Sequence, residues 1–216
     1  MSIKIDLKIF LFAIIFFFTH QIEIYALLMV FALLHELGHL ACGLALGFKP
    51  KAMAINPFGF QIEFQVYIEE YQKRIGKGSR LNIKKMLIAF AGPFTNFIII
   101  LLCFFLPKHL CLEKEIIIYS NFLIAIFNLL PIYPLDGGRI LKEIMQLKFG
   151  LEKAYDITNE TSNIMIIVLT VIGSIIILYI HNIAILLILG YLWYLVIKSN
   201  RWYQIKKSIY RRLKLV

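Results

Sequence analysis

Charged residues are scarce in this chain, and cysteine is rarer still. Only 17% of the 216 residues are charged, whereas 60% are apolar and the mean hydropathy is +0.79. Soluble domains average about 45–50% apolar residues, so the composition excludes an ordinary soluble protein. The three cysteines form no CxxC pair and indicate no disulfide framework. Internal repeats and low-complexity segments are also absent from the sequence.

Long uncharged runs dominate what is present. Their lengths predict an all-α polytopic membrane protein with one domain over residues 1–216. The first run resembles a signal peptide, but no cleavage site of small residues follows it, so we expect it to be retained as a span. The six expected transmembrane helices cover about 5–19, 22–46, 86–106, 116–132, 162–180 and 183–197.

The net charge of +10 follows a topological pattern. With an N-terminus in the cytoplasm, only Lys108 and Lys114 fall in outer loops, and every other Lys and Arg lies on the inner side. This asymmetry predicts a multi-pass protein of the cell membrane with both termini in the cytoplasm. Because membrane topology explains the positive charge, we do not expect the protein to bind nucleic acid.

Two cytoplasmic segments carry patterns of their own. Residues 58–66 alternate apolar with small or polar side chains after the turn-forming pair Asn56 and Pro57, which predicts a short membrane-associated β-ribbon after the second helix. An ordinary interfacial loop is the alternative. Residues 137–153 have helical apolar spacing and are expected to lie along the membrane surface.

The second apolar run contains His35-Glu36-Leu37-Gly38-His39, an HExxH motif. Residues i and i+4 share one face of a helix, so His35 and His39 can present two imidazoles to one metal ion. Glu36 points elsewhere and suits a general base. Two histidines hydrogen-bonded in a helix bundle are the alternative, but that does not explain an adjacent carboxylate at membrane depth.

A catalytic zinc site usually takes three protein ligands. Asp136 is the best candidate for the third, because Pro131 and Pro134 break the helix before it and broken backbone at membrane depth must line a protein-enclosed or wet cavity. A proline-terminated helix capped by the aspartate is the alternative. The other histidines are poor candidates because they lie at outer ends of spans or in outer loops: His20, His109 and His181.

HELGH in one span and NLLPIYPLDGG in a later one resemble the site-2 protease family of intramembrane zinc metalloproteases, peptidase family M50. The GPxxN element of that family matches residues 92–96. The resemblance implies that His35, His39 and Asp136 bind Zn²⁺ and that Glu36 is the catalytic base. The sequence around Asp136 is most similar to that of the stage IV sporulation branch, which processes pro-sigma-K.

The resemblance also implies a substrate class and a cellular role. It implies regulated intramembrane proteolysis, in a bacterial membrane, of a membrane-spanning or membrane-associated protein such as a sigma-factor precursor. An inhibitory membrane partner fits this role, while the oligomeric state is not indicated. We expect two departures from relatives: no CBS domain, which sporulation members carry, and no PDZ-like insertion.

Several further residues have open roles at this stage. Asn128 is expected to act in catalysis by holding a substrate carbonyl or the oxyanion. Asn96 either orders the site or bonds helix to helix, and Cys42 is either a ligand or a small packing residue. The competing functions are a catalytically silent membrane-binding relative and a metal transporter.

Overall fold

The computed structural model describes residues 2–18, 20–56, 59–65, 75–105, 114–180 and 183–214. They are mostly helical and form two compact units, Met1–Leu129 and Leu130–Val216, each of which is described by itself. The single domain expected over the whole chain therefore stays a prediction.

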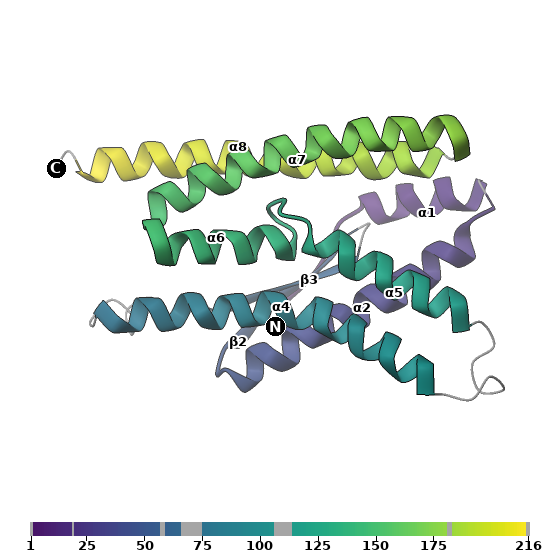
Figure 1. Cartoon of the computed structure of the whole chain (residues 1–216), viewed down its shortest axis with the longest axis horizontal. Helices are drawn as coiled ribbons and strands as arrows, with labels where there is room; N and C mark the ends of the chain where they lie inside the picture. Colours follow the sequence, from purple (N-terminus) through teal and green to yellow (C-terminus); the bar gives the residue numbers. More distant parts are fainter. Residues whose placement is uncertain are drawn as a thin grey trace. The chain divides into compact units, whose positions relative to one another are not determined.

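The first unit combines helices with a small sheet (Figure 1). Helix α2 packs against α4, α4 packs against α5, and the sheet contacts α2. Its elements are β1 (Ser2–Ile5), α1 (Lys8–Phe18), α2 (Ile22–Ala45), β2 (Lys49–Asn56), β3 (Gly59–Gln65), α4 (Ile75–Phe105) and α5 (Lys114–Leu129).

The second unit is helical throughout its described residues. It contains α6 (Asp136–Phe149), α7 (Leu151–Ile180) and α8 (Ile183–Lys214). Helices α7 and α8 lie side by side in opposite directions, and α6 packs against α7 (Figure 1). Gly150 has a φ of 82°, a left-handed value that suits glycine, and it separates α6 from α7.

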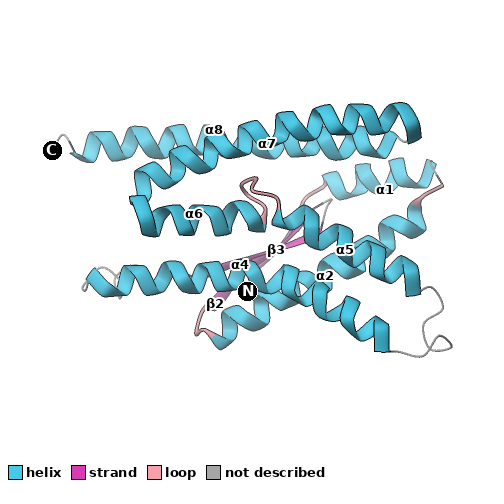
Figure 2. Cartoon of the chain, in the orientation of Figure 1, coloured by secondary structure: helices cyan, strands magenta, loops and turns pink. Residues whose placement is uncertain are grey.

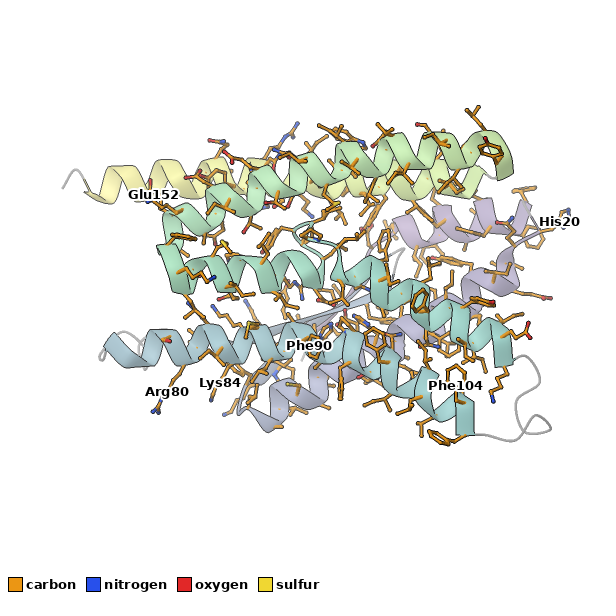
Figure 3. The ribbon with its side chains drawn as sticks, in the orientation of Figure 1. His20, Arg80, Lys84, Phe90, Phe104 and Glu152 are labelled. Carbon is orange, nitrogen blue, oxygen red and sulfur yellow. The ribbon has the colours of Figure 1, made fainter. Side chains whose placement is uncertain are left out.

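Each of the six expected spans falls on a helix, but six spans are not confirmed. Among the described residues, three helices are long and apolar enough to cross a membrane: Ile22–Ala45, Ser79–Phe105 and Leu151–Tyr179. The remaining three spans stay predictions. Large side chains such as Phe94, Leu101 and Phe104 are exposed along α4, as expected for a helix that contacts lipid. Arg80 and Lys84 project from the N-terminal part of α4, and Phe104 lies near its other end (Figure 3).

The predicted β-ribbon is present (Figure 2). Strands β2 and β3 are antiparallel, from the pair Asn56↔Gly59 to the pair Lys49↔Gln65. Residues 57, 58 and 66 lie outside the described part of the chain. The parallel strand β1 along β2 was not predicted, because its four residues alternate polar and apolar side chains over too short a stretch and adjoin the first apolar run.

Helix α2 ends in a Schellman motif that leads directly into β2. The Phe48 N–H donates to the Gly43 carbonyl at 2.9 Å, and the Gly47 N–H donates to the Leu44 carbonyl at 3.0 Å. Gly47 has a φ of 85°, which the motif requires and glycine adopts freely. The Lys84 Nζ donates to the Leu46 carbonyl at 3.0 Å, a favourable place for a cation because the C-terminus of a helix is negative.

Two glycines let α2 approach its neighbours closely. A Cβ on Gly38 would lie 2.9 Å from the Ala91 carbonyl oxygen of α4 and closer still to the Thr95 hydroxyl. A Cβ on Gly43 would meet the Phe64 ring of β3. Both glycines are therefore close-packing positions.

Candidate metal centre

The HExxH motif lies on α2, where His35 and His39 are each only 3% exposed. Their spacing of four residues puts both rings on one face of the helix. The two Nε2 atoms are 3.2 Å apart, and the ring planes are nearly perpendicular. The helix therefore brings two of the predicted metal ligands together.

The other nitrogen of each ring is already engaged. His39 Nδ1 donates to the Ile88 carbonyl oxygen at 2.6 Å, and His35 Nδ1 lies 2.5 Å from Asn96 Oδ1. The Gly92 N–H also lies 3.2 Å from His39 Nδ1, but the shorter contact to a pure acceptor places the ring proton on Nδ1. With that proton on Nδ1, each ring presents the lone pair of Nε2 as an acceptor.

Two acceptors that face each other at 3.2 Å repel unless they share a cation. A separation of 3.2 Å is short enough for both nitrogens to reach one zinc ion, since Zn–N bonds are about 2.05 Å long. Imidazole nitrogen is also a preferred zinc ligand. The donor set on α2 therefore fits zinc.

Gly92 of α4 leaves room beside both Nε2 atoms. A Cβ there would lie 2.4 Å from His39 Nε2 and 2.5 Å from His35 Nε2. Glycine is therefore required at this point for steric reasons, since any side chain would displace the two imidazoles. Pro93 follows inside the helix and is among the most deeply buried side chains.

The other residues considered from the sequence lie on α2, before it or outside the described residues. Glu36 is half-buried on the helix that carries both histidines. His20 precedes α2 and projects from the far end of that helix (Figure 3), about 20 Å from His35 at 1.5 Å per helical residue. His109 and His181 lie outside the described residues. Cys42 is a half-buried free thiol.

Asp136 is the first residue of α6, in the second unit, and is 4% exposed. Its position depends on the preceding loop, in which the N–H of Tyr133 donates to Ser162 Oγ at 2.9 Å and that of Leu135 to the Ile132 carbonyl at 2.7 Å. A Cβ on Gly138 would lie 2.4 Å from the backbone of this loop. The loop thus folds tightly onto the first turn of α6.

Two cations on α6 follow Asp136. Arg139 Nη1 lies 3.6 Å from Asp136 Oδ1. Lys142 Nζ lies 4.4 Å from the centroid of the Tyr155 ring and 5.7 Å from that of Tyr133. Burial alone would lower the pKa of Lys142, but the charges of Tyr155, Tyr133 and Glu143 and a hydrogen bond to Tyr155 together raise it. Lys142 is therefore a cation at neutral pH that holds the loop to α7.

Asn128 is half-buried on α5, and its amide donates to the Ile124 carbonyl at 3.0 Å. One hydrogen of the Asn128 amide thus forms a hydrogen bond within α5. The side-chain oxygen can only accept hydrogen bonds. The catalytic role of Asn128 stays a prediction.

Sequence reasoning missed three parts of this centre. The Ile88 carbonyl orients His39, Gly92 borders both ligand atoms, and Asn121 bonds to Asn96. Every residue has a backbone carbonyl, so the sequence does not show which one will bind a histidine. Asn121, by contrast, is a polar residue within an apolar run, seven positions before Asn128, and this could have marked it.

Comparison with known proteins connects these residues to one family. The model of Peptidase family M50 matches residues 114–173, a range that includes Asn128 and Asp136. Stage IV sporulation protein FB of Bacillus subtilis is 28% identical over 138 residues, 62% of this chain and 44% of that protein. Zinc metalloprotease MJ0392 of Methanocaldococcus jannaschii is 27% identical over 156 residues, 69% of this chain and 42% of that protein.

The chain thus spans less than half the length of these curated relatives. A solved site-2 protease from Methanocaldococcus jannaschii has a similar fold, with a TM-score of 0.66 over 91% of this chain and 89% of that one, at 22% identity. The HExxH helix, the proline-rich loop before a buried aspartate and these similarities together indicate that the chain resembles peptidase family M50, the site-2 proteases.

Proposed function

We propose that this chain is an intramembrane zinc endopeptidase that cleaves membrane-spanning or membrane-associated proteins. The observation that carries the proposal is the pair of Nε2 acceptors on His35 and His39, 3.2 Å apart and held from behind through Nδ1. Such a pair suits a shared cation, and the similarity to zinc metalloproteases makes zinc the expected one.

Asp136 supplies the third ligand in this proposal. Its carboxylate is buried at a helix start, where an anion needs a cationic partner. Arg139 Nη1 lies 3.6 Å from Asp136 Oδ1 and interacts with this charge. Two imidazoles and one carboxylate then leave a fourth position open, as in other catalytic zinc sites.

When bound, zinc supplies a Lewis acid that polarises a carbonyl and makes water acidic near neutral pH. Glu36 takes a proton from the attacking water and returns it to the leaving amine. Asn128 holds the oxyanion or the neighbouring backbone of the substrate through its amide. The residues of α2 thus perform the proton transfer, and α5 orients the reacting carbonyl.

The sheet provides a route for presenting substrate. A transmembrane helix protects its carbonyls by internal hydrogen bonds, so a substrate must be unwound before attack. Strand β2 is paired on both sides, whereas β3 is an edge strand of the described sheet. An unwound substrate segment pairs with β3, and the new strand bonds replace those lost from the helix. Both termini of the chain lie in the cytoplasm in this proposal.

The Glu36→Gln variant tests the activity. Wild-type and variant proteins are each co-expressed with candidate single-span substrates, of which a sigma-factor precursor is the first, and products are compared by size. We expect cleavage by the wild type only, with equal zinc content in both proteins. A silent binding relative would retain substrate in both without cleavage, and a transporter would carry zinc in both. Either result would contradict the proposal.

The Asp136→Asn variant tests the ligand. The neutral amide is a weaker zinc ligand than a carboxylate, so we expect lower zinc content after dialysis, with Arg139→Gln as the control that leaves Asp136 in place. Full zinc retention in the Asp136→Asn variant would show that Asp136 is not a zinc ligand.

A further inference from the structure

A series of buried amides leads from the backbone of α5 to His35. Asn121 Nδ2 donates to the Ile117 carbonyl oxygen at 2.8 Å, and Asn96 Nδ2 donates to Asn121 Oδ1 at 2.8 Å. Asn96 Oδ1 in turn lies 2.5 Å from His35 Nδ1. Both asparagines are 0% exposed. Three helices of the first unit, α5, α4 and α2, thus share one polar network.

The backbone carbonyl fixes the direction of every bond in this series. A carbonyl oxygen only accepts, so Asn121 must turn its NH₂ group toward Ile117 and its oxygen toward Asn96. Asn96 must then turn its own NH₂ group toward Asn121 and its oxygen toward His35. The oxygen accepts only from a protonated Nδ1, which leaves the lone pair on His35 Nε2.

The same outcome is reached for His39 by a shorter path. His39 Nδ1 donates directly to the Ile88 carbonyl oxygen at 2.6 Å. For His35, Asn96 lies beside Nδ1, and Asn121 connects Asn96 to the Ile117 carbonyl of α5. Both rings consequently present Nε2 to the same point, 3.2 Å apart.

We infer that Asn96 and Asn121 are positioning residues that hold His35 in the Nδ1–H tautomer and so direct the lone pair of its Nε2 to a metal ion. The inference rests on the proposed function, which assigns the Nε2 pair to zinc. Asn121 acts only through Asn96: without its oxygen the Asn96 amide can rotate by half a turn and offer NH₂ to Nδ1. That arrangement favours the other tautomer, in which Nε2 carries a proton and cannot bind metal.

A carboxylate at position 96 separates this role from simple helix packing. Aspartate has no NH₂ end, so it accepts from His35 Nδ1 in either orientation and does not need Asn121 to orient it. Carboxylates serve the same purpose behind zinc-binding histidines elsewhere. Loss of Asn121 should therefore weaken metal binding in the Asn96 protein and not in the Asn96→Asp protein.

The experiment measures Zn²⁺ affinity by competition with a chelator, and the visible spectrum of bound Co²⁺, in purified detergent-solubilised protein. We expect Asn121→Leu to lower affinity about 10- to 100-fold, and Asn96→Asp/Asn121→Leu to bind as tightly as Asn96→Asp. Asn163→Leu is the matched control, since it breaks an asparagine pair between α7 and α8 at 2.9 Å and should leave affinity unchanged.

Unchanged affinity in Asn121→Leu, or an equal loss in both backgrounds, would overturn the inference. Should the leucine variant not fold, Asn121→Ser gives the same test, because the shorter side chain stays polar and does not reach Asn96. A wild-type protein that binds neither metal would refute the proposed function and this inference together. A wild type that binds zinc, with Asn121→Leu unaffected, would refute the inference alone.

Discussion

The Gly92→Ala substitution tests how closely α4 borders the metal centre. An added Cβ would lie 2.4 Å from His39 Nε2 and 2.5 Å from His35 Nε2. Carbon and nitrogen need about 3.4 Å, close to the optimal separation of non-bonded atoms, so one or both rings must move by about 1 Å. Metal–ligand distances tolerate only about 0.2 Å.

The rings cannot move freely, because each is held through Nδ1 at 2.5 or 2.6 Å. Displacement breaks at least one of these buried hydrogen bonds, at a cost of about 1–3 kcal/mol. This corresponds to a loss of about 5- to 150-fold in zinc affinity. Since the Cβ meets both ligands, we expect a loss near the upper end, of about 100-fold.

Chelator competition in detergent provides the measurement, and thermal unfolding without metal provides a second one. Gly190→Ala is the matched control, because a Cβ there meets nothing within 4 Å. Alanine is favoured over glycine in a helix by about 1 kcal/mol, so helix propensity alone would stabilise both variants. Zinc affinity of Gly92→Ala within twofold of the wild type would refute the reasoning.

Three further outcomes are expected. Gly43→Ala should lower the unfolding free energy by about 1–3 kcal/mol through overpacking, because its Cβ meets the Phe64 ring; a Phe64→Leu change that relieves none of this loss would contradict the contact. Ser162→Ala should cost about 1–3 kcal/mol in thermal unfolding, since the Tyr133 N–H loses its buried acceptor, and an unchanged midpoint would argue against that bond. Removal of zinc by a chelator should abolish proteolysis and lower the unfolding midpoint, with both restored by zinc; activity that survives complete removal would exclude a zinc mechanism.

Local pattern predicted much of the fold and of the centre. Helical spacing alone puts His35 and His39 on one face, since i and i+4 are neighbours on any α-helix. The alternation after Asn56 was enough to predict the ribbon. The number of membrane spans was harder to predict. A short apolar helix such as α1, with 11 residues, can cross a membrane or lie at its surface, and its sequence does not distinguish the two.

The sequence by itself determined that two imidazoles share a face of an apolar helix and that a carboxylate adjoins them, because these relations depend only on the periodicity of one helix. Tertiary structure alone decided which nitrogen of each ring carries the proton. That choice depends on the Ile88 carbonyl, 49 residues from His39, and on the amide of Asn96, 61 residues from His35, which Asn121 of α5 orients. Such distant groups meet only when three helices pack, and no periodicity records which backbone oxygen will face which ring.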